Sequence, residues 1–123
     1  MTGGVEEGDS MNKEQVVVDA VNEVKLVGRL GSTVAERELP SGDFVTTFTV
    51  VVDRPPRDRR GSATVDSISC QTFSGPIGAR VMSWEPGSLV TVVGVLRRRF
   101  WRSAGGTHSV IEVQAISVRK TRR

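Results

Sequence analysis

Apolar and polar residues alternate along most of the chain from residue 22 onward, and a period of two predicts half-buried β-strands. In the first alternating run, Val24, Leu26 and Leu30 fall on the same side of an extended chain. Gly28 lies within this run and predicts a bulge or a sharp bend of the kind that a closed barrel needs at its corners. Residues that suit a pleated surface predict a short polar strand over 34–39 and longer strands over 44–52, 65–73, 89–99 and 110–118.

Proline and glycine residues separate the predicted strands. The composition of residues 40–43, Pro-Ser-Gly-Asp, predicts a turn. The segment 53–63 holds two prolines, four arginines and one glycine, and Pro55-Pro56 cannot continue a strand ladder. We therefore expect a long cationic loop there, and a flexible hairpin loop over 103–106.

One helix is predicted, over residues 74–84. Ser74 can cap its N-terminus, and Ile77, Val81 and Trp84 form a single apolar stripe. Five long strands with one helix between the third and the fourth are the order of an OB-fold, a small Greek-key barrel. The sequence therefore predicts an all-β chain, a five-stranded Greek-key barrel with one short helix.

The length of 123 residues is enough for one compact domain. We expect an acidic, disordered leader over 1–14, the barrel domain over 15–118 and a basic tail over 119–123. Three consecutive valines at 16–18 leave open whether an additional edge strand begins before the barrel.

Aromatic residues are scarce, so the position of each one matters. Phe44 and Phe48 share a strand face with Val50 and are predicted to lie in the core. Trp84 lies on the apolar stripe of the helix and is predicted to be structural.

Composition argues against several classes of protein. One cysteine, Cys70, excludes an internal disulfide, and one histidine, His108, leaves no metal cluster at familiar spacings, so no metal or cofactor is expected. No apolar run approaches the roughly 20 residues that cross a bilayer, and the N-terminus lacks an apolar signal core. A cytoplasmic protein is expected. Phosphate-binding loops and nucleophile elbows are absent too, so no enzyme is predicted.

Charge is distributed unevenly behind the net value of +3. Residues 1–23 hold six acidic residues and one basic residue, so the remaining 100 residues hold 16 basic and 8 acidic ones. Basic domains of this size commonly meet nucleic acid, and a solvated basic surface is the alternative.

The most informative segment is 97–102, which reads Arg-Arg-Arg-Phe-Trp-Arg at the end of an apolar strand. Arginines attract phosphates and unpaired bases stack on aromatic rings, so this composition indicates single-stranded nucleic acid. Arg97, Arg99 and Trp101 follow the strand period and are predicted to share one face, unless Trp101 instead covers an end of the barrel. Phe100 points the other way and is predicted to lie in the core or in an interface.

The order of these motifs resembles bacterial single-stranded DNA-binding proteins over about residues 22–118. The matching segments are Asn22 to Gly31, Arg37 to Gly42, Phe48-Thr49-Val50, Phe73, Gly87 to Val90, and Gly94-x-Leu96-Arg97-x-Arg99-x-Trp101. The resemblance implies an OB-fold that binds single-stranded DNA without marked sequence preference in replication, repair or recombination. It also implies a homo-oligomer, either a tetramer or a dimer.

The resemblance also assigns residues to the predicted site. It implies base stacking by Phe73 and Trp101, and phosphate contacts by Arg37, Arg97 and Arg99. Phe73 can equally cap the barrel beside the helix. The complete set of predicted DNA-binding residues adds the arginines of the long loop, a serine on the face of Phe73 and one more arginine: Arg37, Arg54, Arg57, Arg59, Arg60, Ser69, Phe73, Arg97, Arg99, Trp101 and Arg102.

Three departures from the family keep other functions open. Ser67 and Pro56 stand where the family has aromatic rings, and the loss favours a protein–protein adaptor of the primosomal replication type with weak nucleic-acid binding. The chain ends in basic residues where the family has a linker and an acidic tip, so the sequence is either cut short or naturally tailless. If it is tailless, recruitment of partners through such a tip is lost. RNA binding remains open, and a nuclease would need metal ligands that the sequence lacks.

Overall fold

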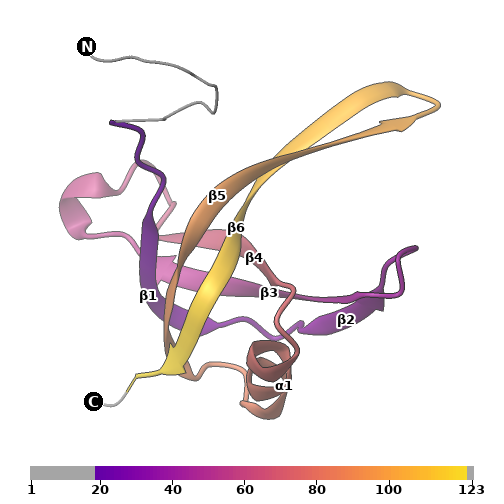
Figure 1. Ribbon diagram of the computed structural model, residues 1–123. Coiled ribbons are helices and arrows are strands. Elements are labelled where there is room, and N and C mark those ends of the chain that lie inside the picture. The colour runs from indigo at the N-terminus through magenta and orange to yellow at the C-terminus, as the bar shows by residue number, and fades with distance from the viewer. Residues whose placement is uncertain (1–18, 122–123) are drawn as a thin grey trace.

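The computed structural model describes residues 19–121 (Figure 1). The predicted leader over 1–14 and the valines at 16–18 lie outside the described residues. The elements in chain order are β1 (Val24–Leu30), β2 (Ala35–Glu38), β3 (Phe44–Asp53), the 3-10 turn η1 (Pro56–Asp58), β4 (Val65–Thr72), α1 (Gly75–Ser83), β5 (Leu89–Ser103) and β6 (Gly106–Lys120).

The five long strands close into a barrel. The strand order is β1-β5-β6-β4-β3-β2, and a second pairing of β1 with β3 joins the two sides of the sheet. The β4–β6 pair is parallel and the other pairs are antiparallel. The helix α1 lies between β4 and β5 in the chain, and β2 extends the edge of β3. The predicted OB-fold is therefore confirmed.

The core fills the barrel, and α1 packs against it. Val50, Val90 and Val92 are fully buried inside the barrel, together with Val81 of the helix. The hydroxyl of Ser74 accepts a hydrogen bond from the backbone N–H of Ile77 at 3.2 Å, so the predicted N-cap is present. Burying these side chains removes apolar surface from water, and this stabilises the barrel.

Gly28 lies where β1 changes partner. Residues 24–29 of β1 pair with β5, and Arg29 and Leu30 also pair with β3. A Cβ atom at position 28 would collide with the carbonyl oxygen of Val51. The predicted bend therefore corresponds to a close approach of two strands that only glycine allows.

Phe44 corrects one expectation about the core. Phe48 is buried at 3% exposure, whereas Phe44 is 51% exposed. The strand period is right, because both side chains alternate with Val45. However, β3 runs past the end of the barrel into its hairpin with β2, and Phe44 lies on this extension.

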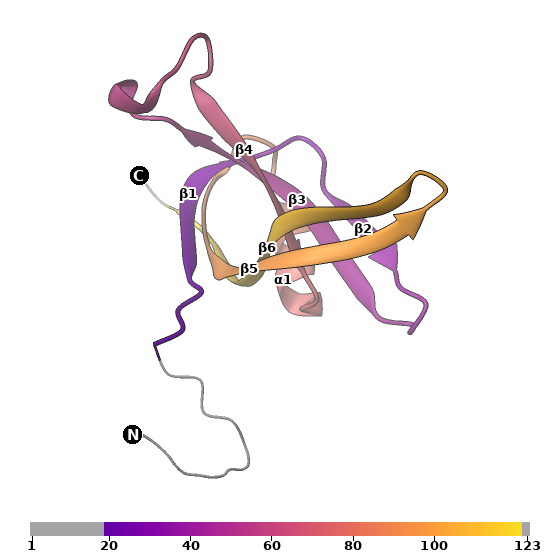
Figure 2. The ribbon, with the colours of Figure 1, turned by 90° about the horizontal axis from the view of Figure 1, so that it is seen from above.

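β5 and β6 are longer than the sequence predicted, and together they form a hairpin that projects from the barrel (Figures 1 and 2). We call residues 97–112 the arm. Ser103 pairs with Gly106, so the hairpin loop contains two residues, Ala104 and Gly105. Arginine-rich segments have little apolar alternation, and this is why the sequence pattern ended before the strands did.

The described part of the chain has no helix that is both long enough and apolar enough to span a bilayer.

Candidate nucleic-acid interface

The strand register brings several predicted residues onto one outer face of the sheet. Residues paired across neighbouring strands project from the same face. Arg37 pairs with Val45 of β3, and Ser69 of β4 pairs with Thr49. The parallel β4–β6 pair, through Gln71 and Gln114, carries this face to β6, where Glu112 lies opposite Arg97. We call this surface the Trp101 face, and its predicted site residues are Arg37, Ser69, Arg97, Arg99 and Trp101.

Trp101 is held in a fixed orientation while much of its ring stays open. The guanidinium carbon of Arg99 lies 5.1 Å from the centre of the indole ring. The ring of His108 stacks on the indole with centroids 5.4 Å apart and planes at 23°. Trp101 is still 42% exposed, so it is not sealed inside the protein. Such a cation–ring arrangement orients an aromatic platform without covering it.

His108 is a part of the site that sequence reasoning missed. Its Nε2 atom lies 2.6 Å from the Oγ atom of Ser103, and the two form a hydrogen bond across the end of the hairpin. Trp101 and His108 are directly paired between β5 and β6. A two-residue loop at Ala104-Gly105 would have predicted this pairing.

Glu112 is the second missed residue, a carboxylate on an otherwise cationic face. Arg99 Nε donates a hydrogen bond to Glu112 Oε1 at 2.9 Å, and the Glu112 side chain is only 9% exposed. Arg97 Nε donates to Gln114 Oε1 at 3.2 Å, so Arg97 keeps its full charge towards solvent. Glu112 therefore balances the charge of Arg99, and the charge of Arg97 stays unbalanced.

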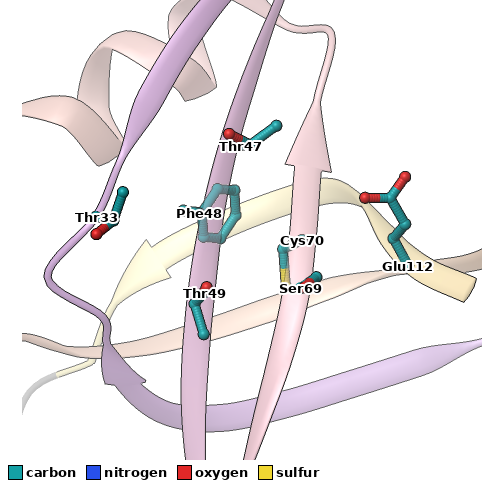
Figure 3. A pocket seen from close by; sticks show the side chains of 7 residues that line it. All are labelled: Thr33, Thr47, Phe48, Thr49, Ser69, Cys70 and Glu112. Carbon is teal, nitrogen blue, oxygen red and sulfur yellow. The ribbon is translucent and has the colours of Figure 1, made fainter. Parts of the chain in front are cut away.

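A pocket of about 210 Å³ lies at the base of the arm (Figure 3). It is lined by hydroxyl groups, one ring, one thiol and the Glu112 carboxylate: Thr33, Thr47, Phe48, Thr49, Ser69, Cys70 and Glu112. Burial, with a smaller contribution from Glu112, raises the pKa of the Cys70 thiol to about 12, so the thiol stays protonated at neutral pH. Ser69 of β4 and Glu112 of the arm line this pocket together.

The arginines of the long loop divide into paired and open side chains. Arg54 forms two hydrogen bonds with Asp66, at 3.1 Å from Nε and 2.7 Å from Nη2. These bonds hold the pKa of Asp66 below its usual range. Arg59 donates from Nε to the carbonyl oxygen of Arg54 at 3.1 Å. Arg57 and Arg60 are exposed, and neither forms an ion pair with a residue that the structure describes.

The loop arginines and Arg102 lie apart from the Trp101 face. The loop with η1 and the arm leave the barrel in different directions (Figures 1 and 2), so the structure does not gather the loop arginines around Trp101. Phe73 follows β4 directly and is 50% exposed. Arg102 lies on the opposite face of the arm, because it alternates with Trp101 along β5.

Among residues 19–121, no three His, Cys, Asp or Glu side chains lie close enough together to hold a metal ion.

The barrel with its arm of cations and rings places the chain among OB-fold proteins. A profile described as the single-strand binding protein family matches residues 21–121. The chain therefore belongs to the single-strand binding protein family, and the resemblance seen in the sequence is confirmed.

Named relatives agree with this assignment. The chain is 36% identical over 99 residues to Single-stranded DNA-binding protein A of Bacillus subtilis (strain 168). This alignment covers 80% of this chain and 58% of that protein. It is 38% identical over 91 residues to the Single-stranded DNA-binding protein of Thermotoga maritima. That alignment covers 72% of this chain and 64% of the Thermotoga protein. The chain thus spans about three fifths of the length of these relatives.

A solved structure shares the fold. The chain superposes on a structure titled Plasmodium falciparum SSB complex with ssDNA with a TM-score of 0.62 and 21% sequence identity. The superposition covers 80% of this chain and 90% of that chain.

Proposed function

We propose that this chain binds single-stranded DNA across the Trp101 face, without marked sequence preference. One observation carries the proposal: the register of five strands aligns Arg37, Ser69, Arg97, Arg99 and Trp101 on one outer surface. Arginines on such a surface attract phosphates, and an open indole stacks an unpaired base regardless of its identity. The family, the names of the relatives and the ssDNA complex of the solved neighbour support it.

We infer the biological setting from the same membership. The protein protects single strands in replication, repair or recombination, in the cytoplasm at the nucleoid, and acts as a homo-oligomer, either a tetramer or a dimer. The relatives' names describe binding and not catalysis, which supports the expectation that the chain is no enzyme. Phe73 and the loop residues Arg54, Arg57, Arg59 and Arg60 add further contacts.

Replacement of Trp101 by Ala tests the proposal directly. Loss of one stacked base is expected to weaken binding by about 1–3 kcal/mol, roughly 5- to 150-fold in Kd. Trp101→Phe keeps a ring and is expected to keep most of the affinity. The measurement is fluorescence anisotropy of a labelled, unstructured oligonucleotide at constant salt.

Trp84→Phe supplies the matched control and a second readout. Trp84 packs against the core at the end of α1, so its replacement should leave the affinity unchanged. In that variant Trp101 is the sole indole, and DNA is expected to quench its fluorescence. If Trp101→Ala binds as tightly as the wild type and no quenching occurs, the proposed site is wrong.

Glu112→Gln should strengthen binding. The substitution removes the one carboxylate that balances Arg99, while the amide oxygen of the new side chain can still accept the hydrogen bond from Arg99 Nε. Tighter binding is expected by several-fold, with a salt dependence of log Kd steeper by about 0.7 per log unit of salt. The control is Glu36→Gln, because Glu36 alternates with Arg37 on β2 and faces away from the Trp101 face. Weaker binding by Glu112→Gln would contradict this expectation and assign Glu112 to positioning Arg99 on the strand.

The second candidate function is a protein–protein adaptor with weak nucleic-acid binding. Ser67 and Pro56 favour it, because both residues are exposed and neither offers an aromatic ring on which a base could stack. An adaptor would bind the oligonucleotide weakly at low salt and would tolerate Trp101→Ala, so the same titration separates the two functions.

A further inference from the structure

The arm has a second face, opposite the Trp101 face, that the predicted site leaves almost unused. On β5 it carries Arg98, Phe100 and Arg102, and on β6 it carries the paired residues Ile111, Ser109 and Thr107. We call it the Phe100 face. Phe100 is 63% exposed, more than any other aromatic side chain in the described part of the chain. The sequence predicted Phe100 in the core or in an interface, and within this protomer the core is excluded.

The Phe100 face repeats the chemistry of the Trp101 face. The guanidinium carbon of Arg98 lies 5.9 Å from the centre of the Phe100 ring, as Arg99 lies over Trp101. Arg98 Nη1 also donates a hydrogen bond to Ser109 Oγ at 3.3 Å, which restrains the guanidinium beside the ring. Each face of the arm thus presents an aromatic ring of β5 with a cation over it.

The two faces differ in charge. Glu112 balances Arg99 on the Trp101 face. On the Phe100 face, Arg98 and Arg102 stand opposite only neutral residues of β6, so this face of the arm carries two cations and no anion. A polyanion complements such a face. A second copy of this chain that presented the same face would bring like charges together, which is unfavourable.

We propose that the Phe100 face is a second surface for single-stranded DNA, with a base stacked on Phe100 and phosphates at Arg98 and Arg102. The inference rests on the proposed function and extends it to the other side of the arm. The strand passes from Trp101 to Phe100 around the hairpin end, where Ser103, Ala104 and Gly105 present little bulk. The ring at position 100 adds a stacking platform to a chain that has none at Ser67 and Pro56.

Phe100→Ala is the primary test. Binding of an unstructured oligonucleotide is expected to weaken by roughly fivefold or more, because one stacked base is lost. Phe100→Trp enlarges the ring and is expected to restore or exceed the wild-type affinity. The matched control is Phe44→Ala, which removes another half-exposed ring, at 51% exposure, from the β2–β3 hairpin. Arg98→Gln and Arg102→Gln should each lower the salt dependence of log Kd by about 0.7.

Trp101→Ala, measured beside Phe100→Ala, separates failure of this inference from failure of the proposed function. Loss of affinity in Trp101→Ala alone overturns the Phe100 face and leaves the proposed function intact. If neither variant loses affinity, both the Phe100 face and the proposed function are wrong.

Photochemical cross-linking to a thymidine oligonucleotide, followed by peptide mapping, decides between DNA and a protein contact. An adduct on Phe100 supports the inference. If Phe100 forms no adduct and Phe100→Ala lowers the sedimenting mass of the free protein, the face is a contact between copies, and the inference is wrong.

Discussion

Raising the salt concentration from about 50 to about 200 mM is expected to weaken binding of an unstructured oligonucleotide by roughly 300-fold. Cations that neutralise phosphates release condensed counterions, and for single strands log Kd changes by about 0.7 per phosphate for each log unit of salt. Apart from Arg59, whose Nε is bonded to the carbonyl oxygen of Arg54, six candidate arginines form no ion pair with a described residue: Arg37, Arg57, Arg60, Arg97, Arg98 and Arg102. If each of these arginines contacts one phosphate, log Kd is therefore expected to change by about four for each log unit of salt.

The salt dependence of log Kd also shows which individual arginines contact phosphate. Arg97→Gln should reduce it by about 0.7, because Arg97 is bonded only to the neutral side chain of Gln114. Lys120→Gln changes the net charge equally but removes an exposed cation at the end of β6 opposite the arm, so its slope should stay close to that of the wild type. A wild-type slope near one would show that stacking dominates, and it would contradict the electrostatic part of the proposed function.

Ion pairs explain why the other arginines are expected to contribute less. Arg54 ties the start of the long loop to Asp66 of β4, and Arg29 ties β1 to Asp53 at 3.1 Å. Hydrogen bonds from Arg29 lower the pKa of Asp53, as those from Arg54 lower the pKa of Asp66. A phosphate would have to displace an existing carboxylate at these positions. The prediction that Arg54 binds DNA stays a prediction, and its contacts with Asp66 brace the loop.

The fold was predictable because its signals are local. Alternation of apolar residues located the strands, and Ser74 with the stripe of Ile77 and Val81 located the helix. Gly28 marked the strand exchange. The same alternation correctly placed Arg97, Arg99 and Trp101 on one face. It failed for Phe44, because a period of two gives the face of a strand and not the point where the strand leaves the barrel.

The site was predictable only in part, because its assembly depends on pairing between distant strands. Ser69 meets the arm through the parallel β4–β6 pair, and no local pattern encodes that register. Glu112 resembles any outward polar residue in a strand, yet Arg99 covers it and leaves its side chain 9% exposed. The sequence predicts Phe100 in a core or an interface because it faces away from Trp101, and its exposure excludes only the core of this protomer. The length of the arm, which leaves both of its faces open, could not be read from an arginine-rich segment.

Gly94→Ala is expected to destabilise the barrel strongly, because two strands approach each other closely at this glycine. A Cβ atom at this position would collide with the carbonyl oxygen of Gln114 and lie 3.0 Å from Ala115 Cα, and both neighbours are backbone. The pairing of β5 with β6 also shifts register between Val93 and Gly94, so the strands are already irregular at this point. Forcing them apart should lower the free energy of unfolding by about 3 kcal/mol, or the melting temperature by roughly 15 °C.

Gly75→Ala is the matched control, because a Cβ atom there meets nothing within 4 Å and position 75 lies in the first turn of α1. It should leave stability unchanged or raise it by a few tenths of a kcal/mol. Urea and thermal unfolding of both variants measure the difference. If Gly94→Ala unfolds like Gly75→Ala, β5 and β6 can separate at little cost where they leave the barrel. The arm would then not be held at a fixed angle, and the alignment of Trp101 with Ser69 and Arg37 would lose its physical basis.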